Sequence, residues 1–203
     1  MIRKLLSLAV LLTAVALPAF AADTYKFEPD HTSVTFTYPH FGLSHPSGKI
    51  MGAAGTLALD WDDPVNCQVD VTLDMTTLTT ALPLFDAMLK GDGYFDVKQF
   101  PTATFKSTSI ELLPPPADPN NPDADDAGKV KEARVTGDMT IHGVTQSVVL
   151  DVTFNRKAFN PALFKTGVGF SGVAHLSRKA FGLSAYEPFV GDEIDIDIEA
   201  EAY

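Results

Sequence analysis

The sequence predicts an all-β protein with one short helix, folded as an antiparallel eight-stranded β-barrel or as a sandwich. Most of the chain alternates apolar and polar residues with a period of two, which is typical of strands that bury one face. The clearest case is residues 194–202, where isoleucine or alanine alternates with acidic residues without a break. Apolar residues at helical spacing occur in a single short segment. About eight strands can close into a barrel, which also removes exposed sheet edges.

The first 21 residues have the pattern of a secretory signal peptide. Arg3 and Lys4 precede an apolar run over residues 5–17, and residues 19–21 (Ala-Phe-Ala) fit a small-x-small cleavage signal. The alternative is a retained membrane anchor, but the apolar run is short for a membrane span. We therefore expect cleavage near Ala21, export of the mature chain, and no stable membrane anchor. Residues 22–203 then form one domain, which is long enough to bury a core.

Charge and cysteine content narrow the possible partners. The chain has a formal net charge of −11, which becomes −13 once the two cations Arg3 and Lys4 are removed. Nucleic acid and anionic membrane surfaces are poor partners for such a surface. Cys67 is the only cysteine, so no disulfide can form within the chain. It is in phase with apolar neighbours, which favours a buried core residue; the alternative is an intermolecular disulfide.

In the first half of the chain, the period-two pattern predicts four strands. Gly52 and Gly55 lie inside the third and would allow it to bend at a barrel corner. The fourth places a set of apolar residues on one face. The expected strands are residues 25–28, 33–38, 48–60 and 65–74, and the apolar set is Val65, Cys67, Val69, Val71 and Leu73.

One segment changes to helical spacing. Apolar residues recur at intervals of three and four from Leu82 to Leu89, with Pro83 near the start and Gly91 just past the end. Thr79 or Thr80 is a candidate N-cap. A helix this short needs tertiary contacts to persist, so we expect it to pack on the barrel and close one end.

The second half of the chain returns to strands. Phe105 and Ile110 are in opposite phase, which predicts a bulge near Ser107. Residues 114–128 carry five prolines and four aspartates and are expected to form a long solvated loop. Deleting residues 115–126 is expected to preserve the fold and lipid binding. Gly143 marks the turn of a hairpin. The expected strands are residues 102–113, 129–141, 144–155, 166–176 and 194–202, with a loop at 181–192.

Several motifs occur together in an order that resembles a known family. They are HTSVTF (31–36), HFGLS (40–44), GYFD (93–96), FPTATF (100–105), VTGDMTIHGVT (135–145) and RKAFG (178–182). In this order and spacing the chain resembles the YceI family of periplasmic lipid-binding proteins. The resemblance implies a lipocalin-like barrel with an apolar tunnel for a polyisoprenoid or similar long-chain lipid, and a possible homodimer. The chain departs from the family at Ala180, where members often have an acidic residue, and in the longer loop at 114–128.

The candidate site is the interior of the barrel. Its many phenylalanines fit either a filled core or the lining of a tunnel, and the resemblance favours the tunnel. Phase places Phe36, Val69, Val71, Leu73, Val152, Phe154, Phe170, Ile196 and Ile198 on the inward face. The candidate ligand-binding residues are Phe36, Phe41, Val71, Leu73, Phe85, Met88, Phe105, Phe154, Phe170, Ala174, His175 and Arg178. A polar head would lie at the mouth, near His175, Arg178 or Tyr186.

These patterns favour a binding or carrier protein and not an enzyme. No Gly-x-Ser-x-Gly nucleophile motif is present. The five histidines lack the i, i+2 pairs that suit a metal site on a strand, although a site assembled from separate strands stays possible. No cofactor is predicted. The alternatives are an enzyme or metal-binding protein that uses histidines at the barrel mouth, and an interaction module with a solid core.

Overall fold

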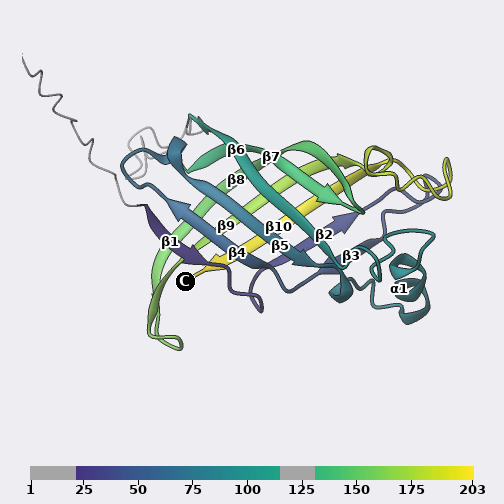
Figure 1. Cartoon of the computed structure of the whole chain (residues 1–203), viewed down its shortest axis with the longest axis horizontal. Helices are drawn as coiled ribbons and strands as arrows, with labels where there is room; N and C mark the ends of the chain where they lie inside the picture. Colours follow the sequence, from purple (N-terminus) through teal and green to yellow (C-terminus); the bar gives the residue numbers. More distant parts are fainter. Residues whose placement is uncertain (1–21, 115–130) are drawn as a thin grey trace, which may run out of the picture.

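The computed structural model describes residues 22–114 and 131–203. The expected signal peptide and nearly all of the expected proline-rich loop lie outside these residues. Within them, ten strands form one antiparallel sheet in the order β1-β4-β5-β6-β7-β8-β9-β10-β2-β3 (Figure 1). The strands are β1 (Asp23–Lys26), β2 (Ser33–Thr37), β3 (Ser47–Ile50), β4 (Ala54–Leu59), β5 (Gln68–Asp74), β6 (Thr102–Leu113), β7 (Glu132–Ile141), β8 (Val144–Asn160), β9 (Lys165–Ser177) and β10 (Glu193–Ala202).

The ten strands occupy eight positions around a barrel. β10 pairs with β2, and just beyond that pairing Ala202 forms a bridge with Phe27, which follows β1. β1 and β2 therefore lie end to end along β10. On their other side, β1 pairs with β4 and β2 pairs with β3, so β3 and β4 also lie end to end. Since β4 pairs with β5, the order returns to its start. The expected eight-stranded barrel is confirmed, with two positions each divided between two short strands.

The expected strand at residues 48–60 is wrong as a single element. It is divided into β3 and β4 by an interruption at residues 51–53. Gly52 and Gly55 have φ angles of 75° and 139°, which L-residues with side chains rarely adopt. A side chain at Gly55 would also collide with the carbonyl oxygen of Asp70 on the neighbouring strand. The two glycines therefore bend the chain at this corner, as their position predicted.

The expected strand at residues 65–74 begins later than its pattern indicates. Pro64–Asn66 form a 3₁₀ turn, and β5 begins at Gln68. Val65 is 45% exposed, so its expected inward position is wrong. The fixed φ of Pro64 suits the start of a helical turn, which overrides the period-two pattern there. Cys67 is half-buried, its Sγ accepts a hydrogen bond from the Asp60 amide, and burial raises the pKa of its thiol.

The second half of the chain follows its sequence pattern closely. β6 has the expected bounds, and its pairing with β7 shifts between Ser107 and Ser109, which confirms the bulge. β7 and β8 are joined by a two-residue turn in which His142 and Gly143 both have positive φ, as type I′ hairpins require. β8 continues to Asn160, beyond the expected end, in a long hairpin with β9.

Helix α1 (Pro83–Lys90) lies at one end of the barrel (Figure 1). The expected threonine cap is wrong, because the N-cap residue is Leu82 and no side chain caps the helix. Thr79 and Thr80 instead donate hydrogen bonds from their hydroxyls to the Asp86 carboxylate, at 2.7 and 2.6 Å. The buried Leu89 and the partly buried Phe85 belong to the core cluster at this end of the barrel. The helix thus packs on the barrel as expected.

Candidate functional site

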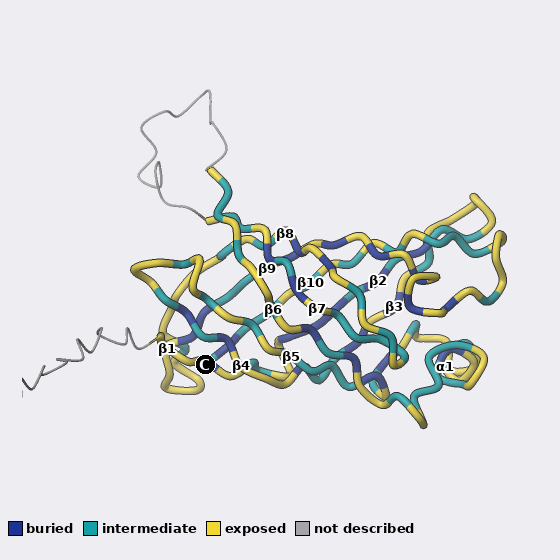
Figure 2. Tube along the Cα trace, turned by 45° about the horizontal axis from the view of Figure 1, so that its top comes forward, coloured by how far each residue is buried: buried dark blue, intermediate teal, exposed yellow. Residues whose placement is uncertain are grey.

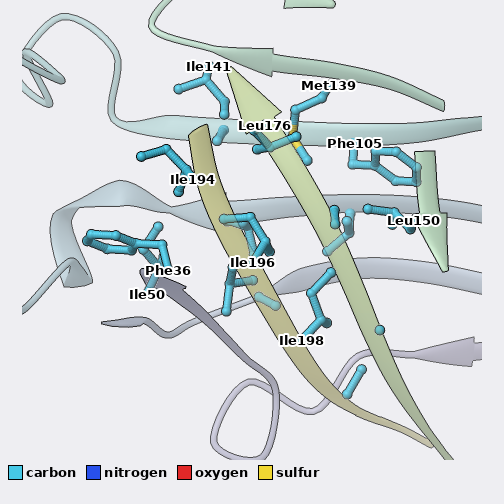
Figure 3. A pocket seen from close by; sticks show the side chains of 18 of the residues that line it. Phe36, Ile50, Phe105, Met139, Ile141, Leu150, Leu176, Ile194, Ile196 and Ile198 are labelled. Carbon is cyan, nitrogen blue, oxygen red and sulfur yellow. The ribbon is translucent and has the colours of Figure 1, made fainter. Parts of the chain in front are cut away.

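The barrel is hollow. A cavity of about 1010 Å³ lies inside it and is lined by residues of strands β2 to β10 and helix α1. Isoleucine, leucine and phenylalanine side chains from strands far apart in the sequence point into the same space, as Phe36, Phe105, Leu150 and Ile196 do in Figure 3. The volume is at the upper end of the ~300–1,000 Å³ typical of small-molecule sites. The interior can therefore hold one elongated apolar molecule.

Strand β10 shows how the sequence builds this cavity. Ile194, Ile196 and Ile198 line it, whereas the alternating acidic residues between them are exposed on the outer face. The isoleucines are half-buried, as expected for side chains that face a hollow and not a packed centre. The burial colours in Figure 2 show such partly buried positions along many of the strands.

The expected inward faces are confirmed. None of the nine residues is exposed, and all of them line the cavity. They are Phe36, Val69, Val71, Leu73, Val152, Phe154, Phe170, Ile196 and Ile198.

Aromatic side chains border the cavity at its α1 end. Phe41 and Phe189 both line the cavity and are both more than half exposed. Their rings stack with centroids 5.1 Å apart, and the Phe41 amide donates to the Phe189 carbonyl at 2.7 Å. Tyr94, after α1, stacks on Tyr186 at 6.0 Å. These pairs join three separate loops into one opening.

Two tyrosines supply polar groups at this end. Tyr38 is buried and Tyr94 partly buried, and both side chains line the cavity. Burial raises the pKa of both phenols above the ordinary value of 10.0. Both hydroxyls therefore stay protonated at neutral pH and can donate hydrogen bonds to a polar group in the cavity.

Arg178 lines the cavity as a structural clamp. Its side chain is buried and donates hydrogen bonds to the carbonyl oxygens of Leu183, Ala185, Val190 and Gly191. These acceptors span the loop between β9 and β10, so the guanidinium holds that loop in place. Each bond joins a cation to a neutral acceptor, which is stronger than a neutral pair. The sequence expectation of a head-group contact did not include this role.

His175 does not face the cavity, so its expected place at the mouth is wrong. Its neighbours Ala174 and Leu176 are buried and line the cavity, and strand alternation therefore turns His175 outward. Its Nδ1 lies 2.7 Å from the Asp195 carboxylate on the outer face of β10.

The remaining expected ligand-binding residues all line the cavity: Phe36, Phe41, Val71, Leu73, Phe85, Met88, Phe105, Phe154, Phe170, Ala174 and Arg178. Sequence reasoning did not include Tyr94, Trp61 or Phe189 in this set. These three lie in loops, where no periodicity indicates the direction of a side chain. Ala180, the departure from the family pattern, does not line the cavity, and its carbonyl accepts a hydrogen bond from Gln146 at 2.9 Å.

The opposite end of the cavity is more polar. Asp60, Trp61, Lys131 and Glu132 line it there. The Trp61 indole donates to Asp23 at 3.0 Å, and the Lys157 ammonium lies 4.5 Å from the centre of its ring. This aromatic side chain is therefore held by polar partners, unlike the stacked rings of the α1 end.

The described part of the chain, residues 22–114 and 131–203, lacks two kinds of feature. No group of three or more His, Cys, Asp or Glu side chains in that part of the chain is placed to hold a metal ion. None of the helices there has the length and apolar character needed to span a membrane.

The fold and the cavity define a class, the small β-barrels that enclose an apolar ligand. Residues 25–202 match the YceI-like domain, and the chain belongs to that family. It is 31% identical over 204 residues to a UPF0312 protein of Pseudomonas savastanoi, covering 99% of this chain and 97% of that one. It is 29% identical over 185 residues to protein YceI of Escherichia coli, covering 90% and 87%.

Solved structures have the same fold. BcnA of Burkholderia cenocepacia aligns with a TM-score of 0.70 at 20% identity, covering 87% of this chain and 99% of that one. A polyisoprenoid binding domain from Saccharophagus degradans aligns with a TM-score of 0.61 at 9% identity, covering 88% and 97%.

Proposed function

We propose that this protein is a non-enzymatic carrier that sequesters a long apolar chain, of the polyisoprenoid class, in the barrel cavity. The observation that carries the proposal is the cavity of about 1010 Å³, lined almost throughout by apolar side chains. Its walls offer no site for a strongly polar substrate along most of their length. Membership of the YceI-like family and the structural similarity to the polyisoprenoid binding domain from Saccharophagus degradans support the ligand class.

The binding energy would come from removing the chain from water. Burial of apolar surface stabilises a complex by about 25 cal/mol per Å². A ligand that buries roughly 300 Å² would therefore gain about 7 kcal/mol before the costs of ordering it. The bore and length of the cavity would then select among chains.

We place any polar head of the ligand at the α1 end. Tyr38 and Tyr94 supply hydroxyl donors there, and Tyr186 lies beside them at the opening. Arg178 contributes positive charge from the cavity wall while it holds the loop that forms the opening. The apolar tail would extend toward Phe154 and Phe170.

The cellular site of this activity is part of the proposal. The N-terminal 21 residues have the pattern of a signal peptide, so we place the carrier in the periplasm.

Native mass spectrometry of protein purified without detergent tests the proposal. A carrier is expected to retain a lipid, seen as a mass increase that disappears after organic extraction. Reloading the extracted protein with a long-chain prenol should restore one ligand per chain. A stoichiometric metal with no lipid would favour the metal-dependent alternative. Protein that carries nothing and cannot be loaded would contradict the carrier proposal and favour an interaction module.

A further inference from the structure

The α1 end of the barrel exposes an unusual number of large apolar side chains. Leu43 is 87% exposed and Leu84 is 90% exposed. The exposed apolar side chains at this end come from three segments. These are the turn between β2 and β3, helix α1 with the residue before it, and the loop between β9 and β10. The exposed set, named here the apolar rim, is Phe41, Leu43, Leu82, Leu84, Met88, Tyr186 and Phe189.

The rim is continuous with the lining of the cavity. Phe41, Met88, Tyr186 and Phe189 are exposed to solvent and line the cavity as well. In Figure 1 helix α1 and the loop between β9 and β10 lie at the same end of the barrel. A ligand that leaves through this opening would therefore pass directly onto the apolar rim.

The rim is also nearly uncharged. In the described segments 39–46, 82–88 and 185–190, the charged residues are Asp86 and Glu187. Asp86 accepts hydrogen bonds from the hydroxyls of Thr79 and Thr80, and Glu187 is also paired. The Glu187 carboxylate lies 2.8 Å from the Lys179 ammonium, so its charge is partly balanced. The chain as a whole has a net charge of −11, so the apolar rim differs from the generally acidic surface around it.

The opposite end of the barrel differs in its charge and in the relation of its exposed apolar side chains to the cavity. It also exposes large apolar side chains. Phe159 and Phe164, on the hairpin between β8 and β9, do not line the cavity, whereas Trp61, which is 43% exposed, does. The Trp61 indole is held there by a hydrogen bond to Asp23. The lining residues there include Asp60 and Glu132. Exposed apolar side chains that line the cavity are therefore more numerous at the α1 end, and at the opposite end Trp61, the one such residue that the structure describes there, lies among charged groups.

We infer that the apolar rim docks reversibly on an electrically neutral lipid bilayer, with Leu43 and Leu84 inserted among the acyl chains. The inference rests on the proposed function, because a bilayer is the phase from which a long apolar chain can enter the cavity without crossing water. A bilayer fits the rim because the surface is apolar and its few charges are satisfied within the protein. The acidity of the rest of the surface disfavours anionic lipids.

Vesicle flotation tests this docking. Full-length mature protein is mixed with phosphatidylcholine vesicles, and the partition coefficient is measured for the parent and for the double variant Leu43→Ser with Leu84→Ser. Each leucine that leaves lipid should lower the coefficient about tenfold. Neither leucine lines the cavity, so prenol binding in vesicle-free solution should be unchanged.

The matched control removes apolar groups from the other end. Phe159→Ser with Phe164→Ser deletes two exposed phenylalanines and should leave flotation unchanged. Equal flotation of the parent and both double variants would overturn the inference, as would loss of flotation in the control alone. A parent that does not float but forms a dimer, broken by the leucine variant in analytical ultracentrifugation, would assign the rim to a second copy of the chain. If the parent protein did not bind prenol in vesicle-free solution, that result would instead contradict the proposed function.

Discussion

Replacing Ala174 by tryptophan is the sharpest test of a hollow barrel. Ala174 lies on β9 opposite Ile196 of β10, is 4% exposed, and lines the cavity. A larger side chain at this position must point into the space between Phe105 and Ile196, which belong to the same cluster. In a hollow barrel the indole takes the place of ligand, whereas in a solid barrel it has no room.

A hollow barrel and a solid barrel predict different changes in ligand affinity and in folding stability. An aromatic ring that displaces about 150 Å² of buried ligand surface removes about 4 kcal/mol of binding energy, which weakens Kd on the order of 500-fold. In a hollow barrel the melting temperature should stay within about 2 °C of the parent. Overfilling a packed core would instead cost about 1–3 kcal/mol of folding stability, or roughly 2–12 °C.

The assay pairs fluorescence binding of a long-chain lipid with thermal melting. Val173→Trp is the matched control, because Val173 is the neighbour of Ala174 and is 45% exposed on the outer face. The control should bind and melt like the parent. If Ala174→Trp melted far below the parent and the parent bound no lipid, the cavity would not be a binding site and the reasoning would fail.

Further predictions concern the two faces of β10 and one buried phenol. Ile196→Asp places a charge on the apolar cavity wall and should lower the free energy of unfolding by several kcal/mol, whereas Asp195→Ser on the outer face should change it by about 0.5 kcal/mol or less; equal melting temperatures would contradict the assignment of faces. Burial raises the pKa of Tyr38, so its contribution to stability is complete below about pH 10 and is lost as the pH rises through its folded pKa. Tyr38→Phe should flatten that alkaline decline in urea unfolding, and an identical decline in both proteins would contradict it.

Strand positions could be predicted well because one face of each strand is apolar. The pattern at residues 102–113 predicted β6 with its bounds, and the change of phase before Ile110 predicted its bulge. Gly52 and Gly55 indicated a bend within residues 48–60, but not that one strand ends and another begins there, which depends on Gly55 lying against the backbone of Asp70 on a neighbouring strand. Such a contact between strands leaves no local signal in the sequence.

The same pattern was less informative about the site. His175 was assigned to the mouth because it is polar, although its phase with Ala174 already placed it on the outer face. Phase also cannot separate a hollow barrel from a filled one, since inward residues are apolar in both. The difference arises from the sum of side-chain volumes around the barrel, and it becomes visible only in the half-exposed state of residues such as Ile196.

The two ends of the barrel suggest a direction for ligand exchange. At the α1 end, Arg178 uses a buried charge to hold the loop that carries Tyr186 and Phe189, so exposed aromatic groups are kept in place beside the cavity. A large contiguous apolar patch on a protein surface usually marks an interaction site, because its removal from water is favourable. At the other end Trp61 is held by Asp23 and lies beside Lys157. A ligand chain that enters or leaves at the α1 end would therefore meet more exposed apolar lining residues and fewer charged groups than at the opposite end.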